Sequence, residues 1–183
     1  GDLFNLFVFF EILLMASYVL LLHGQGKPRF QLGVHYVIIN LLASALFLIG
    51  LGMIYGSVGS LNMADVSRLL PTLDADQHKL AVAGALLLFV VFGIKAAMLP
   101  VGFWLPKTYA VATTPVAAIF TIMTKVGVYA ILRVNGTVFN DALAAHFLQT
   151  WLLPIGLLTS LYGVIGALAA ERLRRFVGFM ILS

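Results

Sequence analysis

Two lysines lie within apolar sequence on either side of a proline-rich segment, and they limit strongly what this chain can fold into. Lys95 ends a run that is apolar from residue 80 onward, and Lys125 lies near the middle of the apolar run 115–132. A lysine at the centre of a bilayer costs roughly 3 kcal/mol unless it finds a partner. Each lysine is therefore a candidate functional residue whose partner has to be found.

The segment between the two runs, residues 99–106 with the sequence LPVGFWLP, cannot form one straight helix. Pro100 and Pro106 each lack a backbone N–H and clash with the helical turn that precedes them. Irregular backbone at membrane depth occurs only where protein buries it or where it lines a water-filled cavity. We therefore expect a helix break at Pro100 and Pro106, beside Lys95, an arrangement typical of ion-transport sites.

The composition supports a membrane location for these runs. Hydrophobic residues make up 62% of the chain and charged residues only 10%, whereas soluble domains contain about 25% charged residues. We expect an all-α integral membrane protein, folded as a single membrane domain over residues 1–183, with about five transmembrane helices, the third one broken, and the start of a sixth. The expected spans are residues 3–22, 31–55, 80–98, 115–132 and 147–170, and the sixth helix begins at 176.

A third charged side chain, Glu11, lies near the centre of the first run. A glutamate is too short to reach the interface from there, and pairing with a lysine would lower the cost of burying both charges. His35 lies near the start of the second run, where an interfacial histidine and a proton-relay residue are both reasonable interpretations. Asn40 and Ser44 share one face of the same run and are interpreted as helix-packing residues.

The predicted loops divide the charges unequally between the two ends of the bundle. One end carries six basic residues and one acidic residue, namely Lys27, Arg29, Lys107, Arg172, Arg174, Arg175 and Glu171. The other end carries three basic and four acidic residues, namely Arg68, Lys79, Arg133, Asp65, Asp74, Asp76 and Asp141. Because cytoplasmic loops are enriched in lysine and arginine, the first end is predicted to be cytoplasmic and Gly1 external.

The same residues disfavour several other classes of site. The chain has no cysteine, so it has no disulfide or thiolate metal site. The carboxylates of the 56–79 loop are loosely spaced beside Arg68 and Lys79, so we interpret them as solvated and expect no metal centre. The net charge of +4 arises in short loops between apolar runs, so we expect a lipid bilayer and no nucleic acid as the surroundings.

The residues around the two lysines form one combined pattern. Lys95 is followed by LPxxxWLPxxY at 99–109 and by a helix with lysine, glycine, tyrosine, leucine and arginine at Lys125, Gly127, Tyr129, Leu132 and Arg133. This pattern resembles the proton-translocating antiporter family, which includes Mrp-type cation/proton antiporters and the large membrane subunits of respiratory complex I. The first run, FNLFVFFEILLMASYVLL, resembles the family's glutamate-bearing helix, and GSLNMA at 59–64 resembles a segment of the Mrp-type antiporters.

The resemblance implies a proton relay in which Glu11 and Lys95 form a coupling pair and Lys125 passes protons onward. It implies that the chain is an internal fragment of a longer multi-helix antiporter bundle. The whole protein would be a multi-pass subunit of a Na⁺ or K⁺/proton antiporter in the bacterial inner (plasma) membrane. It would work with other membrane subunits as an ion transporter subunit, not an enzyme, and with no cofactor of its own.

Two alternatives remain open at this point. The lysine motifs are shared with complex I, so the chain could instead be part of a proton-pumping membrane subunit of NADH-quinone oxidoreductase. A membrane scaffold subunit without transport is the other alternative, and it would tolerate loss of Glu11, Lys95 and Lys125, all of which this sequence has. The GSLNMA segment favours the Mrp-type antiporters over complex I.

Overall fold

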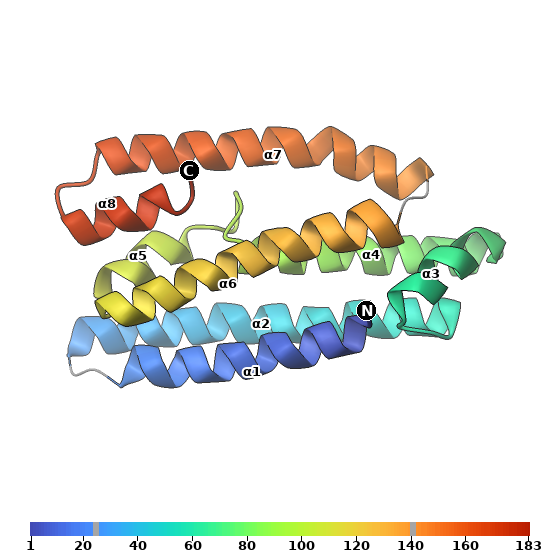
Figure 1. Cartoon of the computed structure of the whole chain (residues 1–183), viewed down its shortest axis with the longest axis horizontal. Coiled ribbons are helices and arrows are strands. Elements are labelled where there is room, and N and C mark those ends of the chain that lie inside the picture. The colour runs from blue at the N-terminus through green and yellow to red at the C-terminus, as the bar shows by residue number, and fades with distance from the viewer. Residues whose placement is uncertain (24–25, 140–141) are drawn as a thin grey trace.

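The computed structural model describes residues 1–23, 26–139 and 142–183, and these are almost entirely helical (Figure 1). Among the described residues, five helices are long and apolar enough to cross a membrane. They are α1 (Leu3–Leu22), α2 (Lys27–Val58), α4 (Ala75–Lys95), α6 (Thr114–Arg133) and α7 (Ala142–Leu168). The predicted all-α fold with five spans, the third one broken, is confirmed.

The spans begin and end where the sequence supplies helix signals. The carboxylate of Asp2 accepts hydrogen bonds from the backbone N–H groups of Phe4 (2.8 Å) and Asn5 (3.0 Å), which caps the start of α1. α2 ends at Gly59, whose φ of 75° is the left-handed conformation that glycine adopts most readily. These local signals fix the limits of helices whose interiors are almost uniformly apolar.

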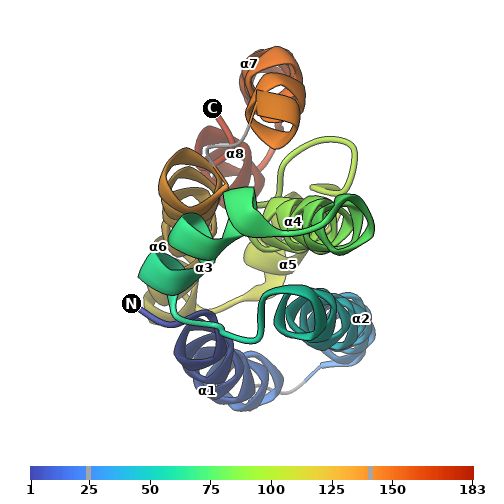
Figure 2. The same cartoon turned by 90° about the vertical axis from the view of Figure 1, so that its right-hand side faces the viewer.

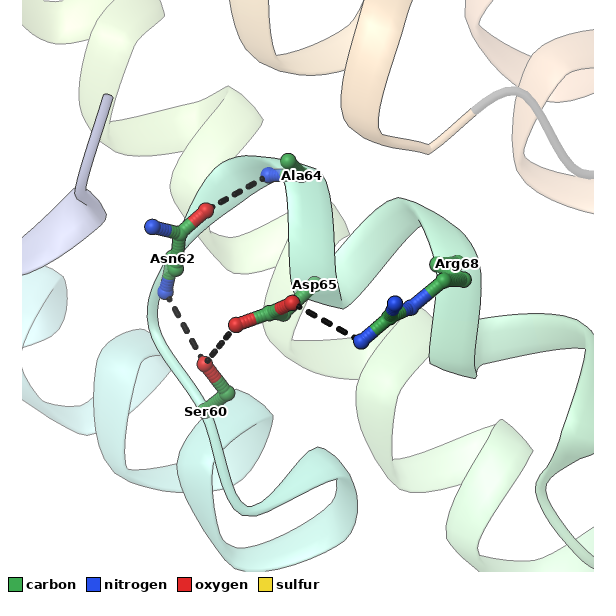
Figure 3. Close-up of polar contacts among 5 residues, drawn as sticks. All are labelled: Ser60, Asn62, Ala64, Asp65 and Arg68. Atoms are coloured by element: carbon green, nitrogen blue, oxygen red, sulfur yellow. Dashed lines mark hydrogen bonds and ion pairs between the residues drawn. The ribbon is translucent and has the colours of Figure 1, made fainter.

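A short helix, α3 (Met63–Leu69), crosses the end of the bundle near Gly1 (Figure 2). Asn62 caps it by accepting a hydrogen bond from the Ala64 N–H at 3.0 Å, and Asp65 pairs with Arg68 at 3.2 Å (Figure 3). In the described part of the chain no cluster of histidine, cysteine or acidic residues could hold a metal ion. The acidic side chains of the 56–79 connection therefore serve as helix caps and as members of exposed ion pairs.

The helices pack in three groups across the bundle, as the view along its axis shows (Figure 2). α1 and α2 lie on one side, α7 and α8 (Leu173–Met180) lie on the other, and α4, α5 (Trp104–Val111) and α6 lie between them. α2 and α4 approach closely at two glycines, where a Cβ added to Gly84 would lie 3.0 Å from the carbonyl oxygen of Gly50. This contact fixes how closely α2 and α4 approach each other.

Several element bounds differ from the sequence prediction: α2 begins at Lys27 instead of 31, and α4 spans Ala75–Lys95 instead of 80–98. The connection between the expected spans 115–132 and 147–170 is shorter than predicted, because α6 continues into a π-helical turn at Val134–Val138 and α7 already begins at Ala142. The turn buries Val134, Val138 and Phe139, which explains why the chain stays helical there. The sixth helix, α8, begins at Leu173 instead of 176 and has eight residues.

The two ends of the bundle separate the charged residues as the loop charges predicted. The ends of α1, α5 and α7 and the starts of α2, α6 and α8 lie together, opposite the N-terminus and α3 (Figure 1). Arg29 joins two of these elements, because its Nε donates to the carbonyl oxygen of Val111 at 2.9 Å. We call this the basic end. Asp141, which the sequence assigns to the opposite end, lies outside the described residues.

Candidate functional site

The candidate site is built around the interruption between α4 and α5. α4 ends at Lys95 and α5 begins at Trp104, and Ala97 between them has a φ of 56°, which is uncommon for a residue other than glycine. Pro100 lies within this connection, and its peptide bond to Leu99 is cis. Pro106 lies just after the interruption, in the first turn of α5, where no N–H is needed.

Neighbouring elements hold the irregular backbone in place. The indole N–H of Trp104 donates to the carbonyl oxygen of Ile94 at 3.1 Å, across the break. The N–H of Leu99 donates to the hydroxyl of Thr159 on α7 at 3.0 Å. A Cβ at Gly102 would lie 2.1 Å from the Ala97 carbonyl oxygen, so only glycine fits there. Ala97 and Gly102 are buried whereas Pro100 and Phe103 are exposed, so the described protein covers only part of the interruption.

Lys95 is the last residue of α4, and its side chain is only 3% exposed. The partial negative charge at the C-terminus of a helix favours a cation in this place. Its Nζ lies 4.0 Å from Oε1 of Glu11 and 5.2 Å from the centre of the Phe10 ring, which adds a cation–π contact. Nζ makes no hydrogen bond to any described group. The structure therefore brings Glu11 and Lys95 together as a loose ion pair.

A third helix contributes to this pair through Ser44 of α2. The Ser44 hydroxyl donates to Oε1 of Glu11, the same oxygen that faces Lys95. The sequence interpretation of Ser44 as a packing residue missed this contact. Its position four residues after Asn40 shows only that the two share a helix face, not what that face meets.

Lys95 also lines an internal cavity of about 10 Å³, which is roughly the space of one water molecule. Three polar side chains line the same cavity: Tyr36 and Asn40 of α2 and Tyr109 of α5. The hydroxyl of Tyr36 is hydrogen-bonded to that of Ser17 at 2.8 Å. A water in this cavity would lie beside Lys95 and these polar side chains, whereas Glu11 does not line it. No sequence motif pointed to Tyr36, whereas Tyr109 is the tyrosine of the LPxxxWLPxxY pattern.

Lys125 lies apart from this cluster. Its side chain is exposed and lines a groove of about 250 Å³ formed by the α4–α5 connection, α6, α7 and the C-terminal residues. Ala96 and Met98, which follow Lys95, line the same groove. Gly127 lies two residues after Lys125 on α6, and a Cβ added to it would lie 2.7 Å from the backbone nitrogen of Ala96. The backbone of α6 is therefore in direct contact with the backbone at the end of α4. The helix of Lys125 therefore crosses α4 directly at its Lys95 end.

His35 is not brought to the site. It is exposed on α2, although the adjacent Tyr36 is buried and lines the Lys95 cavity. His35 itself does not line that cavity. Of the four candidate relay residues, the structure groups Glu11 with Lys95, places Lys125 in the neighbouring groove and leaves His35 on the outer face of α2.

The sequence of this chain is similar to those of known membrane proteins. The family model described as "NADH:quinone oxidoreductase/Mrp antiporter, TM" matches residues 1–181. The D subunit of a probable K⁺/H⁺ antiporter from Rhizobium meliloti (strain 1021) is 50% identical over 100% of this chain and 34% of its own length. The D subunit of the Na⁺/H⁺ antiporter from Bacillus subtilis (strain 168) is 40% identical over 100% of this chain and 36% of its own length.

A solved structure agrees with these sequence relatives. A chain of the Mrp complex from Dietzia sp. DQ12-45-1b superposes with a TM-score of 0.87 and 31% identity, covering 100% of this chain and 34% of that one. This chain thus spans about a third of the length of the relatives it matches. With the family model matching almost every residue, the chain belongs to the NADH:quinone oxidoreductase/Mrp antiporter transmembrane family.

Proposed function

We propose that this chain is part of a subunit of a multisubunit Na⁺ or K⁺/proton antiporter and that it carries a section of the proton path. The observation that carries the proposal is the buried Lys95 ammonium 4.0 Å from the Glu11 carboxylate, beside an interrupted helix. A buried ion pair adds little to stability compared with apolar packing, whereas ionisable groups within membranes mark ion pathways. The 40–50% identity to the D subunits of two antiporters supports the antiporter over the other family branch.

In this proposal protons pass between Glu11 and Lys95 and then onward to Lys125. The second step would run past the end of α4, since Ala96 lines the groove that Lys125 faces. The remaining part of the path and the cation-binding groups would lie in other parts of the full-length protein or in partner membrane subunits. Both K⁺ and Na⁺ occur in the names of the relatives, so the proposal covers either cation.

Reconstitution of the full-length protein with its partner subunits tests the function. In proteoliposomes, an imposed Na⁺ or K⁺ gradient is expected to drive proton movement in the opposite direction, read with an entrapped pH-sensitive dye. Liposomes without the complex give the background rate. Proton movement that requires NADH and a quinone, with none driven by a cation gradient, would assign the chain to the complex I branch.

The orientation is tested separately by cysteine labelling. We propose that the basic end faces the cytoplasm, because lysine and arginine concentrate in cytoplasmic loops. His23 at the basic end and Thr72 at the opposite end are both exposed. In a full-length protein without other cysteines, His23→Cys should resist a membrane-impermeant maleimide in intact cells, and Thr72→Cys should react. The opposite labelling pattern would reverse the proposed orientation, in which Gly1 is external.

A further inference from the structure

We propose that Ser44 is a positioning residue that holds the Glu11 carboxylate just short of a direct hydrogen bond to Lys95. In this arrangement the ion pair stays loose enough for Lys95 to release its proton. The inference rests on the proposed function and assigns a role in it to a residue outside the two charged groups.

The geometry at Oε1 of Glu11 carries the proposal. Ser44 donates a hydrogen bond to this oxygen from α2, while Nζ of Lys95 remains 4.0 Å away on α4. A direct hydrogen bond between ammonium and carboxylate would be about 2.7–2.9 Å long. The carboxylate is therefore bound to the serine and only approached by the lysine, whose Nζ makes no hydrogen bond to a described group.

Other hydroxyls of the bundle show that this contact is unusual. Six of them donate to carbonyl oxygens three or four residues back in their own helix: Ser17, Ser57, Thr108, Thr121, Thr124 and Thr159. Such back-bonding is the ordinary solution for serine and threonine within helices. Ser44 instead reaches a charged group on a different helix, although it is buried to the same extent as Ser57, each being 6% exposed.

The common pattern also supplies an alternative partner for the Ser44 hydroxyl, the carbonyl oxygen of Asn40 one turn earlier. With the hydroxyl turned back, the Glu11 carboxylate is free to close on Lys95 and to hold its proton more firmly. With the hydroxyl on the carboxylate, the pair stays open. Ser44 would thus set how tightly Glu11 holds Lys95 at each stage of transport.

Two variants of equal shape test the role of the hydroxyl. Ser44→Thr keeps the donor and Ser44→Val removes it, while both add similar volume. In proteoliposomes containing the full complex, Ser44→Val should lower the maximal exchange rate about tenfold, the effect of one charge-assisted hydrogen bond. The half-saturating cation concentration should not change, because Ser44 acts on the proton path. Ser44→Thr should keep most of the activity.

Ser57→Val is the matched control, since it removes an equally buried hydroxyl from the same helix that donates only within α2. It should transport like the parent. Ser44→Ala repeats the comparison without added volume in case the branched variants assemble poorly. Equal maximal rates for the Thr and Val variants, or a parental rate for the Ala variant, would overturn the inference.

The outcome for Glu11→Gln distinguishes this inference from the proposed function. If Glu11→Gln still exchanges cations for protons, the proposed relay is wrong and the role of Ser44 falls with it. If Glu11→Gln is inactive and the Ser44 variants transport alike, the relay stands and only the positioning role is wrong.

Discussion

Glu11→Gln in the full-length complex is expected to lower cation-driven proton exchange at least about a hundredfold. Glutamine has nearly the same shape and can still accept the Ser44 hydrogen bond, but it carries no charge. Removing one partner of a buried pair strands the other, which costs about 3–5 kcal/mol, or roughly two to four powers of ten in an equilibrium. The rate is measured by dye quenching in vesicles that contain equal amounts of assembled complex.

Glu171→Gln is the control for this experiment, because it makes the same change at an exposed glutamate of the basic end and should leave transport unaltered. A double variant separates transport from stability. Glu11→Gln with Lys95→Met removes both charges, so it should assemble better than either single variant, as apolar replacements of buried pairs often do. It should still fail to transport. Normal exchange by Glu11→Gln, or recovery of exchange in the double variant, would show that the pair has only a structural role.

Lys125→Arg is expected to assemble normally and yet to lose at least about 99% of its proton exchange. Arginine keeps the positive charge and the hydrogen-bond donors but does not deprotonate in proteins, whereas a relay residue must release its proton in every cycle. The groove of about 250 Å³ around Lys125 has room for the longer side chain, so poor fit is not expected to cause the loss. The initial rate of exchange after a cation jump is the measurement.

Two comparisons make this result specific. Lys107→Arg changes an exposed lysine at the basic end and should leave the rate unaltered. Lys125→Ala removes both the charge and the proton carrier and should also fail, so it does not discriminate between the two roles. Parental exchange by Lys125→Arg would show that Lys125 supplies a fixed positive charge and that protons take another path.

The limits of the transmembrane helices could largely be predicted from the sequence. α1 has the expected bounds, because Asp2 caps its start and a polar turn follows Leu22. The π-helical turn that follows α6 could not be predicted, since Val134 and Val138 stay helical only where neighbouring helices bury them. Composition locates apolar runs, whereas such contacts depend on how the runs are packed.

The candidate site, too, could be predicted only in part from the sequence. The cost of burying charge was enough to single out Glu11, Lys95 and Lys125 and to expect a pairing between the first two. The contact of Ser44 with Glu11 depends on how α2 is rotated and how closely it approaches α1. Neither the rotation of α2 nor its distance from a neighbouring helix can be predicted from the sequence of one apolar run. Prolines mark where a helix is interrupted, but Pro106 shows that a proline can also begin the next one.

The backbone contact between Gly127 and Ala96 limits how the two lysine-bearing helices can move. With no side chain between them, α6 and the end of α4 cannot slide apart or repack locally without opening a void in the membrane interior. We therefore expect the two helices to move together, which would keep the distance between the backbones of Lys95 and Lys125 nearly constant. If the chain carries protons as proposed, a gate that admits them from one side at a time would consist of rotating side chains and rearranging water, not of movement between these two helices.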